Sequence, residues 1–95
     1  MKFYIVKHHF FIHSDECEEG MLLKMFDSKH KKDAFKYFDA IKSAEQMYAN
    51  ENGFETEEDE GYFFASDEDG SAIEIWVEER VVNETDDGSF FTISV

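Results

Sequence analysis

Residues 3–12 carry apolar side chains on both faces of a strand, and this pattern constrains the fold more than any other feature. In an extended segment alternate side chains point to opposite sides. One side then carries Tyr4, Val6, Phe10 and Ile12, and the other carries Phe3, Ile5 and Phe11. A strand that is apolar on both sides is typical of the centre of a sheet, so we expect strands along both of its edges.

The next segments predict a second strand and one helix. The loop 13–20 leads into a strand at 21–26, which we expect to pair with the first strand as an antiparallel hairpin. Asp27 or Ser28 then caps a helix that runs to about Asn50 and ends at Asn52-Gly53. An apolar stripe at helical spacing marks its buried face: Ala34, Tyr37, Phe38, Ile41, Ala44 and Tyr48.

Three more strands follow the helix and are separated by turns that use Gly, Asn and Asp, because the chain has no proline. We expect strands at 62–66, 72–82 and 90–95, with turns at 67–70 and 83–88. The predicted fold is a single α+β domain over residues 1–95, with one amphipathic helix packed on a mostly antiparallel sheet of about five strands in the order β-β-α-β-β-β. Eleven Phe, four Tyr and one Trp supply its core.

The charge of the chain divides into two unequal halves. Residues 1–42 hold eight of the nine basic residues and seven acidic ones, whereas residues 43–95 hold sixteen acidic residues against Arg80 alone. Such one-sided charge repels itself and does nothing for folding. We therefore expect the acidic half to serve solubility, a cationic ligand or a basic partner surface.

Several classes of function are disfavoured by these features. The N-terminus lacks a signal peptide pattern, and no segment approaches the roughly 18 apolar residues of a membrane span. An anionic chain is repelled by nucleic acid phosphates. Cys17 is the only cysteine, which excludes an intrachain disulfide. We expect a cytoplasmic protein, monomeric or homodimeric, that binds neither membranes nor nucleic acid directly.

Motifs for metals and catalysis are also weak. The four histidines are His8, His9, His13 and His30, and on a strand His9 and His13 lie about 13 Å apart, which is too far for a shared metal. The Asp-Gly turns fail the EF-hand spacing, and sequence neighbours such as His13-Ser14-Asp15 cannot form a hydrolase triad. Solvated carboxylates lack the selectively raised pKa that acid–base catalysis needs. We predict no metal, no cofactor and no enzymatic activity.

The segment 72–82 adds an apolar candidate for binding. Ile73, Ile75 and Val77 alternate with Glu74, Trp76 and Glu78. If the aliphatic set faces the helix, Trp76 lies on the opposite face between two glutamates, where its large rigid ring suits a binding hot spot. The alternative is that a neighbouring loop, such as 54–61, covers Trp76 as ordinary core.

Acidic residues gather in the tract 55–60, in the turns 67–69 and 86–87, and on the strand around Trp76. This surface, on a small proline-free α+β domain, resembles the nucleic-acid mimics of phages and mobile elements, such as anti-CRISPR and anti-restriction proteins and inhibitors of DNA-repair glycosylases. The resemblance implies stoichiometric inhibition of a basic nucleic-acid-binding protein, such as a nuclease or an effector complex. The candidate partner-binding residues are Glu55, Glu57, Glu58, Asp59, Glu60, Asp67, Glu68, Asp69, Glu74, Trp76, Glu78, Asp86 and Asp87.

Two other functions stay open at this stage. An acidic immunity or regulatory protein would bind its partner through an apolar anchor centred on Trp76, and its binding would depend little on salt. A small metal-dependent or acid–base enzyme would bind a metal stoichiometrically or have a pocket for a ligand.

Overall fold

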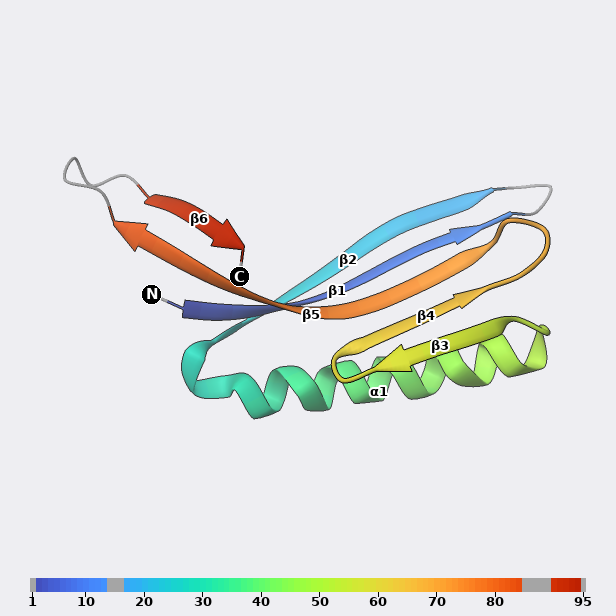
Figure 1. Ribbon diagram of the computed structural model, residues 1–95, viewed down its shortest axis with the longest axis horizontal. Coiled ribbons are helices and arrows are strands. Elements are labelled where there is room, and N and C mark those ends of the chain that lie inside the picture. The colour runs from blue at the N-terminus through green and yellow to red at the C-terminus, as the bar shows by residue number, and fades with distance from the viewer. Residues whose placement is uncertain (1, 14–16, 85–89, 95) are drawn as a thin grey trace.

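Strand β1 (Lys2–Ile12) lies inside the sheet, as its two apolar faces predict. The structure is a computed structural model that describes residues 2–13, 17–84 and 90–94, with side chains up to residue 81. In this part of the chain one α-helix packs against an antiparallel sheet of six strands, so the predicted α+β class is confirmed (Figure 1). The remaining elements are β2 (Glu18–Asp27), a 3-10 turn (Ser28–His30), α1 (Lys31–Glu51), β3 (Glu55–Asp59), β4 (Tyr62–Ser66), β5 (Ala72–Glu84) and β6 (Phe90–Ser94).

The sheet has the strand order β2-β1-β5-β4-β3, and β6 pairs with the far part of β5. The predicted hairpin of β1 and β2 is confirmed, with Phe3 opposite Asp27 and Ile12 opposite Glu18. The other edge of β1 pairs with β5, a strand about seventy residues later, from Lys2 opposite Val81 to Phe11 opposite Ala72. All five strand pairings are antiparallel.

The predicted cap at Asp27 opens a 3-10 turn, and α1 itself begins three residues later than expected, at Lys31, with no side-chain cap on His30. The Asp27 carboxylate accepts a hydrogen bond of 2.9 Å from the Lys29 amide and so satisfies one of the free N–H groups at the start of the 3-10 turn. At the other end the Asn52 amide bonds to the Tyr48 carbonyl. Gly53 then takes a φ of 73°, which only glycine adopts without strain, and the chain turns back toward β3.

The hydrophobic core lies between α1 and one face of the sheet. Its buried strand residues are Tyr4, Val6, Phe63, Ala65, Ile73 and Ile75. On the helix the buried residues are Ala34, Phe38 and Ala49, whereas Ala44 and Tyr48, both expected in the buried stripe, are exposed. The side of the helix that contacts the sheet runs through Ala34, Phe38 and Ala49, and Ala44 and Tyr48 lie to one side of it.

Strand β3 is a finding that the sequence did not predict. Residues 55–59 read as an acidic connection, yet they pair along their whole length with β4, from Glu55 opposite Ser66 to Asp59 opposite Tyr62. All five side chains are exposed, so β3 gains its conformation from this pairing and not from burial. The predicted turn after β4 is confirmed, because the Asp67 carboxylate accepts hydrogen bonds from the amides of Asp69 and Ser71.

Removing the Phe63 ring should destabilise the fold, because this fully buried side chain packs in the core. We expect Phe63→Ala to lower the free energy of unfolding by about 3–5 kcal/mol in urea titrations. Met47 on α1 is 65% exposed, so Met47→Ala is the matched control and should change the free energy of unfolding by less than about 0.5 kcal/mol. Equal effects of the two substitutions would contradict this core.

Candidate functional site

One face of the sheet is turned away from α1, and we call it the open face. Tyr4 and Val6 lie in the core under the helix, so the odd-numbered residues of β1 point to the other side. Residues that are opposite in neighbouring strands share a face, so the register assigns the open face across the sheet. It comprises Glu55, Glu57 and Asp59 of β3; Tyr62, Phe64 and Ser66 of β4; Ala72, Glu74, Trp76, Glu78 and Arg80 of β5; Phe3, Ile5, Lys7, His9 and Phe11 of β1; and Glu19, Met21, Leu23, Met25 and Asp27 of β2.

The chemistry of the open face changes in order from β3 to β2. One cross-strand row runs Asp59, Tyr62, Trp76, Lys7 and Leu23. The next row runs Glu57, Phe64, Glu74, His9 and Met21. Both rows are acidic at β3, aromatic and ionic at the centre, and apolar at β2.

The carboxylates of β3 and its following turn form what we call the acidic edge: Glu55, Glu57, Glu58, Asp59 and Glu60. All five side chains are exposed. Within the described residues one ion pair reaches this edge, from Lys42 Nζ of α1 to Glu58 Oε2 at 3.4 Å. Because salt bridges between exposed groups contribute little, most of the negative charge of the edge is left for solvent or a partner.

The turn after β4 brings a second group of acidic residues to one end of the acidic edge. Glu55 lies opposite Ser66, and both line a hollow of about 170 Å³ together with Gly53, Asp67 and Glu68. The Asp67 carboxylate already holds the turn through its two amide hydrogen bonds. Glu68 and Asp69 are exposed, so these two extend the acidic edge. Asp86 and Asp87, also predicted to bind a partner, lie outside the described residues.

Trp76 lies on the open face, as the alternation in β5 predicts, and is half-buried there. Its indole Nε1–H donates to Glu78 Oε1 at 2.8 Å, and Lys7 Nζ lies 5.8 Å from the ring centroid. Tyr62, its neighbour on β4, donates a hydrogen bond of 3.2 Å to Glu74. Polar contacts thus fix the orientation of the ring while part of its surface stays accessible.

Glu78 belongs to an internal ion-pair network. Lys7 Nζ lies 2.9 Å from Glu78 Oε1, and the Arg80 guanidinium contacts the other carboxylate oxygen through Nη2 at 2.6 Å and Nε at 2.8 Å. Burial alone raises the pKa of Glu78, but hydrogen bonds from Trp76, Lys7 and Arg80 outweigh it and lower the pKa to about 2. The negative charge of Glu78 is therefore already balanced by ion pairs inside the protein, unlike the charges of the acidic edge.

Tyr62 responds to the same acidic surroundings. Burial raises the pKa of its hydroxyl, and the hydrogen bond to Glu74 and the charges of Glu74 and Glu57 raise it further. The hydroxyl therefore keeps its proton and donates to Glu74, which is consistent with a structural role for this pair. Glu74 and Glu78 both point to the open face, but each already accepts a hydrogen bond within the protein.

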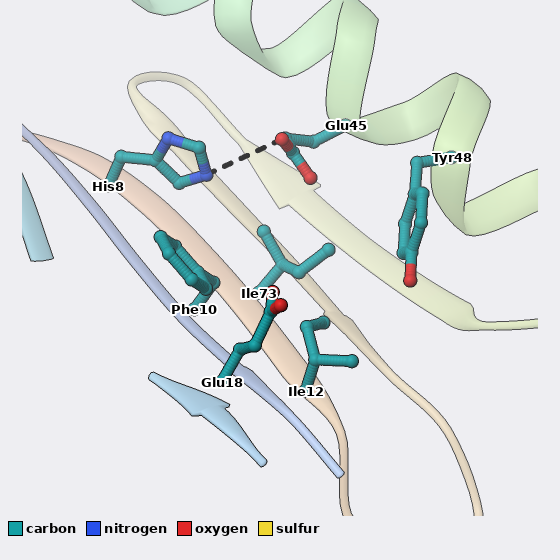
Figure 2. Close-up of a pocket in the computed structure, with 7 residues that line it drawn as sticks. All are labelled: His8, Phe10, Ile12, Glu18, Glu45, Tyr48 and Ile73. Carbon is teal, nitrogen blue, oxygen red and sulfur yellow. Dashed lines mark ion pairs between the residues drawn. The ribbon is translucent and has the colours of Figure 1, made fainter. Parts of the chain in front are cut away.

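A cavity on the helix side of the sheet was not predicted from the sequence. It measures about 270 Å³ and is lined by His8, Phe10, Ile12, Glu18, Glu45, Tyr48 and Ile73. Figure 2 shows His8 of β1 and Glu45 of α1 pointing toward each other above the apolar side chains. His8 Nε2 lies 3.6 Å from Glu45 Oε1, which is an ion-pair distance but too long for a hydrogen bond, so this buried nitrogen has no hydrogen-bond partner among the described residues.

The only sequence signals for this cavity are the alternation that turns His8 toward the helix and the one-turn spacing of Glu45 and Tyr48. The meeting of the two elements is a tertiary contact that neither pattern contains. Among residues 2–13, 17–84 and 90–94, no three His, Cys, Asp or Glu side chains come together in a way that suits a metal ion. In the same residues no helix combines the length and apolarity needed to cross a membrane.

Comparison of the chain with protein-family models, with curated proteins and with solved structures finds no significant match. The surface itself is therefore the basis for a functional proposal.

Replacing Glu78 by an uncharged residue should destabilise the protein in a pH-dependent way. Its pKa is lowered from an ordinary 4.5 to about 2, so the carboxylate stabilises the fold above pH 4.5 and this stabilisation is lost as the pH falls toward 2. We expect Glu78→Gln to lower the free energy of unfolding at pH 7 by about 1–3 kcal/mol and to have progressively less effect between pH 5 and pH 2 in urea titrations. Glu68→Gln in the exposed turn is the control, and an effect of Glu78→Gln that does not change with pH would contradict the network.

Proposed function

We propose that this protein is a non-enzymatic inhibitor that binds the cationic nucleic-acid-binding surface of a partner protein, as a DNA or RNA mimic of the anti-CRISPR or anti-restriction type. The observation that supports this proposal is the acidic edge, a row of exposed carboxylates on a paired strand. A paired strand fixes the backbone that carries these side chains, so binding avoids the backbone entropy cost of ordering a flexible acidic loop. The edge therefore offers a preorganised anionic surface.

The spacing of the carboxylates resembles that of phosphates, so they could face a partner surface that normally binds phosphate. Glu55, Glu57 and Asp59 alternate along β3 and share the open face, so they recur about every 6.8 Å. This separation is comparable to that between backbone phosphates along a nucleic acid strand. Lysine and arginine side chains that neutralise phosphates in the partner would meet the same charge pattern here.

The distribution of basic residues leaves this surface anionic. Lys2 pairs with Glu79 at 2.7 Å, and Lys7 and Arg80 pair with Glu78. Three basic side chains thus form ion pairs with carboxylates of β5. Lys29 lies in the 3-10 turn and Lys31 and Lys32 lie at the start of α1, the end of the helix that is farther from the start of β3 in Figure 1. Ion pairs between the basic and the acidic half of the chain thus lie mainly where β1 meets β5, and most carboxylates of β3 stay unpaired among the described residues.

A second candidate is an acidic immunity or regulatory protein whose affinity comes from an apolar anchor at Trp76. The observation that favours it is the position of the half-buried ring at the centre of the open face, next to Tyr62. Both candidates act in the cytoplasm, in a host cell if a phage encodes the protein, and neither binds nucleic acid directly. They differ in how binding responds to salt.

The acidic edge is tested by removing its charge without changing its shape. We expect the unmodified protein to capture a basic nucleic-acid-binding protein from nuclease-treated lysate at about 0.1 M salt, and about 0.5 M salt or added duplex DNA to reverse this capture. Glu57→Gln/Glu58→Gln/Asp59→Asn should abolish the capture at about 0.1 M salt. The matched control, Asp33→Asn/Asp39→Asn/Glu51→Gln, removes the same charge from α1 and should leave capture intact. Equal loss with both triple variants would show that net charge, and not the acidic edge, is responsible.

The Trp76 anchor makes the opposite prediction about salt. If it dominates, Trp76→Phe should weaken binding more than loss of the three carboxylates does, and raising the salt concentration should change affinity little. Isothermal titration of the identified partner at two salt concentrations measures both effects. A steep loss of affinity with salt together with a small effect of Trp76→Phe would eliminate this candidate.

A further inference from the structure

Strand β2 forms one edge of the sheet (Figure 1). It exposes an unusual amount of apolar surface. Among the described residues its sheet partner is β1 alone. Met21, Leu22, Leu23 and Met25 are 47%, 58%, 59% and 63% exposed. They lie on both faces of the strand, because Leu22 is on the helix side and the other three are on the open face. A long apolar edge of this kind is a template for pairing with another strand.

The opposite edge of the same sheet is protected against such pairing. β3 carries four carboxylates in five residues, and bringing a second β3 alongside would place like charges opposite each other. β2 has no carboxylate between Gly20 and Phe26, and its one charged residue there is Lys24. The chain therefore protects one edge with charge and leaves the other edge open.

Charge also limits where two copies of this chain can approach each other. Each copy has a net charge of −14, so most faces repel their counterparts. The segment from Gly20 to Phe26 is an exception, since it is apolar with a single positive charge. In an antiparallel arrangement the acidic start of one β2, at Glu18 and Glu19, runs alongside the half of the other β2 that contains Lys24 and ends at Asp27. A parallel arrangement would instead bring the two acidic starts together.

We propose that β2 pairs antiparallel with β2 of a second copy, so that two sheets join into one continuous sheet across a two-fold axis. Such an isologous contact uses the same patch on both copies, and this segment supplies matching apolar surface with Lys24 of each copy on the side of Glu18 and Glu19 of the other. The dimer covers β2 and leaves both copies of β3 free at the far ends of the joined sheet. It is therefore independent of the acidic edge and compatible with the proposed inhibition.

The test is sedimentation equilibrium of the full chain over a wide concentration range. We expect a monomer–dimer equilibrium that Leu22→Lys/Met25→Lys weakens at least about tenfold, because two apolar contacts are lost from each copy and the lysine side chains must be desolvated in the joint. These substitutions lower the net negative charge, so general repulsion cannot explain the loss. Both residues are largely exposed in one copy, and an unchanged circular dichroism spectrum of the monomer would confirm that the fold is intact.

Met47→Lys/Asn50→Lys adds the same charge to exposed positions of α1 and is the control, which should leave dimerisation unchanged. Salt should strengthen the dimer, because it screens the repulsion between two anionic copies, whereas it should weaken the proposed partner binding. Amide hydrogen exchange supplies the second readout, with protection of residues 20–26 that increases with protein concentration. A chain that stays monomeric throughout, or a dimer that leaves these amides unprotected, would overturn the proposal without affecting the proposed function.

Discussion

The pairing of β1 with β5 is the interaction on which the rest of the structure depends. It joins residues 2–11 to residues 72–81 and places both strands in the interior of the sheet. Tyr4 and Val6 of β1 and Ile73 and Ile75 of β5 then form the floor on which α1 packs. Because the two strands are separated by most of the chain, their pairing closes a large loop, and its entropy cost must be met by this core.

The same pairing explains how a chain with such uneven charge folds. β1 comes from the nearly neutral half and β5 from the acidic half, and their register brings Lys2 to Glu79 and Lys7 to Glu78. Attraction across the central strands thus offsets part of the repulsion within the acidic half. Among the described residues, the exposed carboxylates of β3 take no part in this pairing, because β3 lies at the edge of the sheet beside β4 alone.

The elements that local pattern specifies were predicted well. The two apolar faces of β1 placed it at the interior of the sheet, and the Asp67–Gly70 turn followed from its residue types. Gly53 marked the end of the helix, whereas Asp27 caps the 3-10 turn that precedes α1. β3 was missed because Glu and Asp have low strand propensity, and its conformation comes from pairing with β4.

What sequence cannot supply is the geometry between elements. The periodicity of α1 indicated an apolar stripe but not the contact line on the twisted sheet, so Ala44 and Tyr48 were expected inside and are exposed. For the same reason the residues at the candidate site were identified without their environments. Glu57 and Glu78 look equivalent in the sequence, yet one is exposed on an edge and the other is held by Lys7, Arg80 and Trp76.

The two ends of the sheet show how a single surface can separate two kinds of contact. From β3 to β2 the open face changes from carboxylates to methionine and leucine, and the ionic cluster around Trp76 lies between them. The proposed attraction to a cationic partner would act over about a Debye length and be strongest at β3, whereas the proposed apolar association needs direct contact and would meet least repulsion at β2. Because screening weakens the first kind of contact and favours the second between anionic copies, the two proposed contacts should respond to ionic strength in opposite directions.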